Sequence, residues 1–324
     1  MPANLDSMMY TGEMPWHRSG TRLDNPATAE EAMVAAGLAW EVQKQPLYTG
    51  PDRDVRVKDR YVVCRMDRLE EGAGGQLGIV GRDYEPLQNR QAFGFLDPVV
   101  GQAAAIYHTA GSLQEGRRVW MLAKLPGEIH IIGDDVAEKY VLLSNSHDGT
   151  SAVRIGLTPI RVVCQNTLNL ALGGMQGLTI RHFADVAQRV HEAHDLLGIV
   201  RQRFDHATTV MRNMTKVSLG TLRVSEFFNH VMPVPKAEDE PGRKAIVQRH
   251  NRLAELFEVG DGNHLPGVRG TLWAAYNAVT QWADRESYTK RHKEPLKTIW
   301  FGNAARVKEY AFEVAEDWTK ASLN

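Results

Sequence analysis

The pattern of hydrophobic and polar positions changes along the chain. Between Trp40 and about residue 157, the apolar residues form short runs rich in β-branched and aromatic side chains, separated by clusters of Gly, Pro and Asp. Such runs predict β-strands joined by turns. Beyond about residue 184, apolar residues recur every three or four positions, which predicts amphipathic helices. The sequence therefore predicts an α+β fold, with an antiparallel β-sheet and flanking helices in the N-terminal half and a helical C-terminal region.

Two domains are predicted from this change of period. Residues 1–183 form an α+β domain that ends in a meander followed by a helix at 159–172, and residues 184–324 form a mainly helical region. The Pro-rich, highly charged segment 232–244 is typical of an exposed connector between helices. Length alone favours two domains or one large one, because 324 residues with 43% hydrophobic side chains can bury a sizeable core.

One short helix is predicted ahead of the strands. Thr28 is a candidate N-cap, Glu31 occupies the position of its capping-box partner, and Gly37 ends the segment. A second helix is expected from Asn89, interrupted near Pro98. The strands are expected at WEVQKQPLY, YVVCRMD, QLGIVGRDY, RRVWMLAKL, GEIHII, KYVLLSNS and SAVRIGL. Turns at Pro126-Gly127, Gly133-Asp134 and Asp148-Gly149 are expected to join the last four strands.

The segment SNSHDGTSAVRIGLTPIRVVCQNTL, residues 144–168, concentrates polar and charged side chains between apolar ones. Its first part predicts a tight hairpin, in which alternation along the return strand directs Arg154 away from the core. His147 and Asp148 lie at the tip of this hairpin. Turn stabilisation by the Asp side chain is favoured there over an acid–base pair.

The second part of the segment predicts a helix. Thr158 is a good N-cap and Pro159 suits the first helical position. Arg161 then falls in the first turn, where the helix dipole disfavours a positive charge, and Gln165 and Asn166 share its side of the helix. Two interpretations stay open. Either an internal Asp or Glu pairs with Arg161, or this arginine and the one on the preceding strand hold a phosphate while the two amides bind a base or sugar.

A basic segment near the C-terminus is a second candidate site. Residues 287–310 hold six Lys or Arg against two Glu, interleaved with aromatic residues. A basic groove with exposed aromatic faces is typical of proteins that bind single strands, although aromatic residues at helical spacing also suit a core. The candidate contacts are Lys290, Arg291, Lys293, Lys297 and Trp300.

Composition narrows the class of protein. A net charge of −1 argues against the uniformly basic surface of a duplex-DNA binder, although residues 201–310 carry an excess of Lys and Arg. No signal peptide or membrane-spanning run is evident and both cysteines lie in apolar runs, so a cytoplasmic protein without membrane contact is expected. The pair in HEAHD has the wrong spacing for a helical zinc site, and no phosphate loop or nucleophile elbow occurs. No metal, cofactor or catalytic residue is therefore assigned.

Several segments together resemble a known family. They are MPWHRSGT near the start, SNSHDGTSAVR followed by TPIRVVCQNTLNLAL, and GTLWAAYNAVTQWAD with the later WFGNAARVKEYA. These are similar to the phage/plasmid-like protein family, a domain of unknown function carried by bacteriophages, plasmids and laterally transferred islands. The resemblance covers nearly the whole chain and implies a mobile-element protein that acts inside a bacterial cell. It implies no activity.

The leading functional hypothesis is a non-enzymatic nucleic-acid-binding protein of a phage or mobile element, used in recombination or replication. Its expected ligand is single-stranded nucleic acid, and a homo-oligomer is compatible with this role. The alternative, from a different class, is a protein-binding factor that inhibits or redirects a host defence or replication component.

Overall fold

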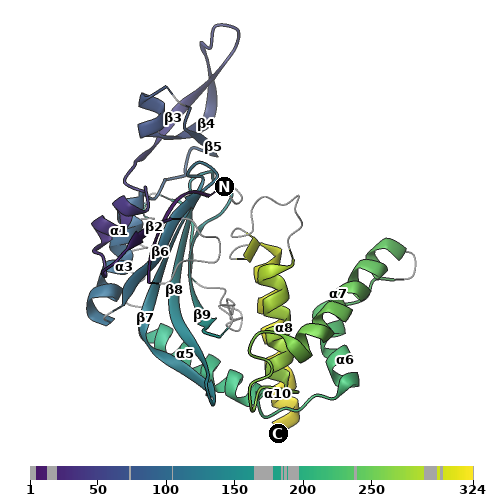
Figure 1. The fold of residues 1–324 in the computed structure, drawn as a ribbon. Helices are drawn as coiled ribbons and strands as arrows, with labels where there is room; N and C mark the ends of the chain where they lie inside the picture. Colours follow the sequence, from purple (N-terminus) through teal and green to yellow (C-terminus); the bar gives the residue numbers. More distant parts are fainter. Residues whose placement is uncertain are drawn as a thin grey trace. The chain divides into compact units, whose positions relative to one another are not determined.

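The computed structural model, drawn in Figure 1, divides the chain into two units. The residues described are 5–12, 20–72, 74–103, 105–163, 178–183, 185, 188, 197–236, 239–287, 298–299 and 302–323. The first unit comprises residues 1–126, 140–156 and 176–198, and the second comprises residues 127–139, 157–175 and 199–324. Each unit therefore combines segments that are distant in the sequence.

Two β-sheets contain the strands, and the predicted α+β fold is confirmed. The larger is a seven-stranded mixed sheet in the order β10-β9-β8-β7-β6-β1-β2, in which β1 and β2 are parallel. The smaller is antiparallel, in the order β3-β4-β5. The strands are β1 (Leu5–Thr11), β2 (Thr21–Leu23), β3 (Val42–Thr49), β4 (Val55–Arg65), β5 (Gln76–Gly81), β6 (Ile106–Leu113), β7 (Arg118–Ile132), β8 (Asp135–Ser146), β9 (Val153–Arg161) and β10 (Leu178–Ile180).

The first unit contains the predicted N-terminal helix, α1 (Ala29–Ala35). The Thr28 side chain accepts a hydrogen bond from the Glu31 backbone, and the Glu31 carboxylate accepts one from the Thr28 backbone at 2.9 Å, so the predicted capping box is confirmed. The short α2 (Met66–Glu70) follows β4. The helix α3 (Asn89–Ala103) packs on α1 and continues through Pro98, so the predicted interruption is wrong.

Two predicted boundaries in the meander are also wrong. No turn separates two strands at Pro126-Gly127. Both residues lie within β7, and Gly127 adopts a φ of 75° there without reversing the chain. The helix expected to begin at Pro159 does not begin there, because β9 continues to Arg161 and a turn follows at 162–163. The rest of that predicted helix lies outside the described residues. The turns at Gly133-Asp134 and Asp148-Gly149 do separate β7, β8 and β9.

The second unit holds the C-terminal helices that the period of 3.6 predicted. They are α5 (Leu197–Met214), α6 (Thr221–Val231), α7 (Glu240–Val259), α8 (Leu272–Arg285) and α10 (Asn303–Leu323). The predicted connector is shorter than expected, because Asp239 caps α7 by accepting a hydrogen bond from the Gly242 backbone. α8 is buried along almost its whole length and packs against α7 and α10.

A buried ion pair joins the strands of the second unit to its helices. Arg161 and Asp135 are both 0% exposed, and the guanidinium donates from Nε and Nη2 to the two carboxylate oxygens at 2.7 Å. Trp273 on α8 donates its indole N–H to the same carboxylate at 2.7 Å. The backbone carbonyls of Asp261 and Gly262 accept two further bonds from Arg161 at 3.0 Å. Buried charges need this degree of pairing, because desolvation otherwise outweighs their attraction.

Replacing one partner of this pair is expected to destabilise the protein strongly. Asp135→Asn leaves the Arg161 charge buried without a counter-ion, and breaking a buried pair costs about 3–5 kcal/mol. The free energy of unfolding in urea measures the loss.

The matched control is Asp134→Asn, because Asp134 is the exposed neighbour of Asp135. This change is expected to alter the free energy of unfolding by about 0.5 kcal/mol or less. Equal effects of the two substitutions would contradict the role of the ion pair.

Candidate nucleic-acid interface

The structure removes Arg161 from the surface candidates. Its guanidinium is sealed in the second unit and saturated by Asp135 and two carbonyls, so no phosphate from solution reaches it. The expectation that Arg161 binds an anion at a helix N-terminus is therefore corrected. The residue lies at the end of a strand, and an internal carboxylate supplies its negative partner.

Of the other binding residues predicted from the sequence, only Arg154 lies among the described residues. Arg154 is exposed on β9, in register with Thr179 of β10. The remaining candidates lie outside the described residues, so their role in binding nucleic acid stays a prediction. They are Gln165, Asn166, Lys290, Arg291, Lys293, Lys297 and Trp300.

A different basic surface is formed by strands β3 and β4, residues 42–65, which we call the basic hairpin. Its pairing extends well beyond the part of β4 that pairs with β5, and Figure 1 shows its end projecting past β5. The register is interrupted, because Pro46 pairs with Tyr61 whereas Tyr48 pairs with Arg56. Residues 57–60 of β4 therefore form a bulge opposite a single residue of β3. Bulges re-aim side chains and are frequent beside functional sites.

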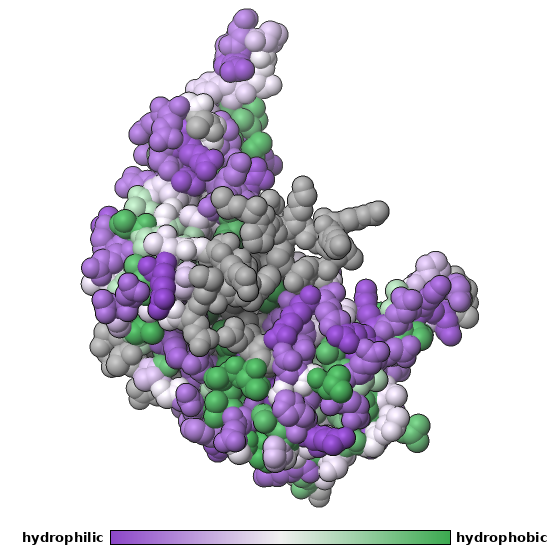
Figure 2. All heavy atoms as spheres, in the orientation of Figure 1, coloured by the Kyte–Doolittle hydropathy of each residue, from purple (hydrophilic) through white to green (hydrophobic). Residues whose placement is uncertain are grey.

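The bulge presents a cluster of positive charges. Arg56, Lys58 and Arg60 are exposed, and Arg53 lies in the connecting turn. None of these four has a carboxylate partner among the described residues, although the hairpin also carries three Asp. In Figure 2 the end of the hairpin is mainly hydrophilic. Unpaired cations on a projecting strand are free to contact an anionic partner.

Aromatic rings lie among these cations. The Arg56 guanidinium is 5.9 Å from the centre of the Tyr61 ring, and the Lys44 ammonium is 5.3 Å from it. Tyr48 stands opposite Arg56 and is 48% exposed. Base stacking on aromatic faces next to backbone-binding cations is the usual way of holding a single strand. The hairpin therefore combines both groups that such a ligand requires.

Sequence reasoning predicted β3 but only part of β4, because the strand expected at YVVCRMD begins at Tyr61 and runs into α2, and it missed the surface. The available signal was the spacing of Arg56, Lys58 and Arg60 at every second position of the run VRVKDRY. Such alternation predicts one basic face on a strand. It does not predict the bulge, in which Asp59 adopts a φ of 54°.

The tip of the hairpin between β8 and β9 has a different chemistry. Asp148 accepts hydrogen bonds from the Ser146 hydroxyl and from the Thr150 backbone. Burial opposes the ionisation of Asp148, but these hydrogen bonds outweigh it and lower the pKa of its carboxyl group. The structure thus has Asp148 stabilising the turn, the interpretation that the sequence favoured.

Beneath this turn, His147 is fully buried in a polar network. Its Nε2 lies 3.1 Å from Asn89 Oδ1, and the Asn145 amide donates to the Leu87 carbonyl at 3.0 Å. Burial, with a contribution from the nearby His182, lowers the pKa of His147 to about 3. Burial also lowers the pKa of His182. Both imidazoles are therefore neutral at physiological pH.

These histidines predict an acid-sensitive fold. The unfolded chain binds protons near the ordinary histidine pKa of about 6.5, whereas folded His147 resists protonation until about pH 3. Stability is therefore complete above about pH 6.5 and falls as the pH decreases toward 3, with a slope of up to about 1.4 kcal/mol per pH unit for each such histidine. Urea unfolding between pH 7 and 4 measures this slope.

His147→Asn is expected to make the slope shallower, whatever its effect on stability at neutral pH. The control is His130→Gln, because the His130 side chain is 69% exposed on β7. An unchanged slope in the His147 variant would contradict this account.

Metal ligation and membrane insertion find no support in the part of the chain that the structure describes. Within it, no three His, Cys, Asp or Glu side chains are grouped as metal ligands would be. Among the same residues, no helix has both the length and the apolar character that crossing a bilayer requires.

Comparison with known proteins gives a family but no activity. No solved structure matches the chain. A family model described as "Domain of unknown function (DUF932)" matches residues 76–300, which include the β8–β9 turn and exclude the basic hairpin. Since the match spans more than half of the sequence, the chain belongs to this family of unknown function, DUF932.

Proposed function

We propose that the chain is a non-enzymatic protein that binds single-stranded nucleic acid through the basic hairpin. The observation that carries this proposal is the bulge of β4 and the residue before it, where the cations Arg56, Lys58 and Arg60 are exposed without carboxylate partners. Tyr48 and Tyr61 lie beside them. The cations suit the phosphates of a strand and the rings suit its bases.

A single strand fits this surface better than a duplex. The net charge of the whole chain is −1, so its attraction for nucleic acid is local rather than a property of the entire surface. Tyr48 can stack only on a base whose face is accessible. The bases of a duplex are stacked on one another, so their faces are not accessible along the strand. The bulge supplies few phosphate contacts, so several copies of the protein along one strand would bind more tightly than one copy.

The family resemblance supports a setting, which is part of this proposal. We place the protein in the cytoplasm of a bacterial cell, encoded by a phage or another mobile element. Recombination and replication of such elements both expose single strands, and a protein that coats them serves either process.

A protein-binding role is the second candidate function. Val55 and Ile79, on the same small sheet, are 55% and 60% exposed. The two residues do not form one patch, because Val55 pairs with Thr49 at the end of the hairpin whereas Ile79 pairs with Val62. Each is a separate apolar contact point that suits a protein partner better than a polyanion. The two roles differ in their response to salt, because only phosphate binding weakens steeply as salt rises.

Fluorescence anisotropy with a labelled oligonucleotide tests the leading proposal. Binding is expected at low salt, with an affinity that falls as salt increases. The triple variant Arg56→Gln, Lys58→Gln, Arg60→Gln is expected to bind more weakly and to reduce the slope of log affinity against log salt by about 2, because each single-strand phosphate contact contributes about 0.7. Tyr48→Ala is expected to lose about 1–3 kcal/mol of binding free energy through lost stacking.

The matched control removes three exposed arginines elsewhere in the same unit: Arg22→Gln, Arg90→Gln, Arg117→Gln. It changes the net charge by the same amount but is expected to retain most of the affinity. Equal losses in both triple variants, or no binding at low salt, would overturn the proposal.

A further inference from the structure

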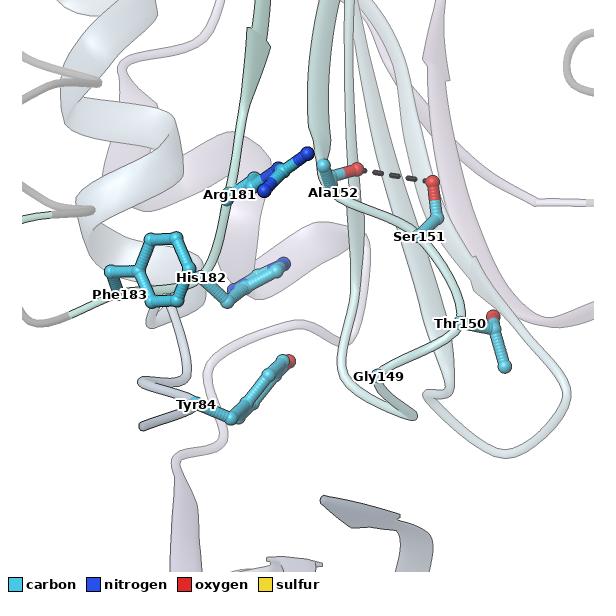
Figure 3. A pocket seen from close by; sticks show the side chains of 8 residues that line it. All are labelled: Tyr84, Gly149, Thr150, Ser151, Ala152, Arg181, His182 and Phe183. Carbon is cyan, nitrogen blue, oxygen red and sulfur yellow. Dashed lines mark hydrogen bonds between the residues drawn. The ribbon is translucent and has the colours of Figure 1, made fainter. Parts of the chain in front are cut away.

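A separate pocket lies in the first unit, away from the residues of the basic hairpin. Its volume is about 330 Å³. Figure 3 shows Tyr84, His182 and Arg181 in a row on one side of the pocket, facing the loop from Gly149 to Ala152. Phe183 completes the lining. This volume lies near the lower end of the range of about 300–1,000 Å³ for small-ligand sites. The pocket is open toward solvent, so it can hold one face of a ligand of about one nucleotide in size.

Strand pairing explains why residues so distant in sequence meet there. β10 pairs with β9 so that Ile180 stands opposite Val153, and the antiparallel register then brings Arg181 beside Ala152. His182 is anchored to the segment after β5, because its carbonyl accepts a hydrogen bond from the Glu85 backbone at 2.9 Å. Tyr84 donates its hydroxyl to the Ser146 carbonyl at 2.8 Å, which joins the Tyr84 and His182 side of the pocket to the end of β8.

Arg181 gives the pocket a positive charge. Its side chain is exposed and has no carboxylate partner among the residues that the structure describes. Two acidic residues adjacent in sequence to the lining have partners of their own, since Asp148 accepts hydrogen bonds from Ser146 and Thr150, and Glu85 lies 3.8 Å from Lys44. The guanidinium is therefore available for an anionic group of a ligand.

The pocket also has aromatic walls. The Tyr84 and His182 rings are stacked, with centroids 4.7 Å apart and planes inclined by 25°. Phe183 is 44% exposed at the rim. A planar group that enters beside Arg181 can cover this ring, and covering an exposed aromatic ring is favourable.

One buried polar atom of the lining has no partner. His182 is 6% exposed, and its Nδ1 must carry the proton because it lies 3.1 Å from the Glu85 carbonyl, which can only accept. Its Nε2 is then a hydrogen-bond acceptor, and it has no donor among the described residues. Buried polar atoms without partners are rare and costly, so this atom points to a missing donor such as a hydroxyl or amino group.

These three features define one class of ligand. We propose that the pocket bounded by Arg181, His182, Phe183 and the Gly149–Ala152 loop binds a single nucleoside phosphate. The phosphate pairs with Arg181, a sugar hydroxyl or base amino group donates to His182, and the base covers Phe183. The nucleotide is either free in solution or the terminal residue of a strand, since both present the same groups.

Calorimetric titration of the full chain with the four nucleoside 5′-monophosphates tests this site. At least one of them is expected to bind, more tightly than either its nucleoside or inorganic phosphate alone. Arg181→Gln is expected to weaken binding by about tenfold or more, because a hydrogen bond to a charged group is lost. Phe183→Ala is expected to weaken it by a smaller factor, and the control Arg22→Gln, another exposed arginine of the same unit, is expected to leave it unchanged.

Competition distinguishes the two sources of the nucleotide. If a short oligonucleotide with a 5′-phosphate displaces the monophosphate and its unphosphorylated form does not, the site takes a strand end. If neither oligonucleotide displaces it, the site takes a free nucleotide. The site is overturned if none of the four monophosphates binds at millimolar concentration, or if Arg181→Gln binds as well as the unchanged protein.

This proposal and that of the basic hairpin fail independently. The triple variant of Arg56, Lys58 and Arg60 is expected to bind the monophosphate normally, whereas Arg181→Gln is expected to keep the salt-dependent binding of long strands.

Discussion

The buried pair of Arg161 and Asp135 is the constraint on which the second unit depends. Two charges without exposure are retained only when nearly every donor and acceptor is satisfied. Here the carboxylate accepts three hydrogen bonds from Arg161 and Trp273, and the carbonyls at 261 and 262 take two more from the guanidinium. Position 262 requires glycine, because its φ is 74° and a Cβ there would lie 2.9 Å from Arg161 Nη2. Strand, loop and helix must therefore meet in one geometry.

This constraint explains why local sequence signals failed around Thr158. An N-cap is worth about 1 kcal/mol, whereas leaving a buried charge unpaired costs about 3–5 kcal/mol. The tertiary contact wins, so β9 continues to Arg161, and the Thr158 hydroxyl caps nothing and has no partner among the described residues. Where no such contact opposes the local signal, as at the capping box of Thr28 and Glu31, the sequence predicted the helix start correctly.

The candidate sites were less predictable than the fold for a related reason. The strand predicted at YVVCRMD covers only residues 61–65 of β4, although the alternation of Arg56, Lys58 and Arg60 indicates a basic strand before it. The bulge opposite Leu47 depends on how the two strands fail to pair, which has no periodic signature. The pocket depends on the register between β9 and β10, which brings Arg181 beside Ala152. Periodicity assigns residues to faces, whereas a site also depends on which charges find partners, and this is decided only by contacts distant in sequence.

Three arginines of this chain show how environment decides what one side chain can do. Arg161 makes its hydrogen bonds to groups inside the protein and stabilises the fold. Arg56 stands on a projecting strand with only a weak contact to Tyr61, so its attraction for a phosphate is exposed to screening over about 8 Å at physiological salt. Arg181 lies between these extremes, beside the buried acceptor of His182. A ligand hydrogen bond to that acceptor would be less screened than a contact with Arg56, because His182 is only 6% exposed. In the two sites that we propose, recognition in the pocket would therefore depend on the shape and donors of one nucleotide, whereas the hairpin would respond to the charge of a strand.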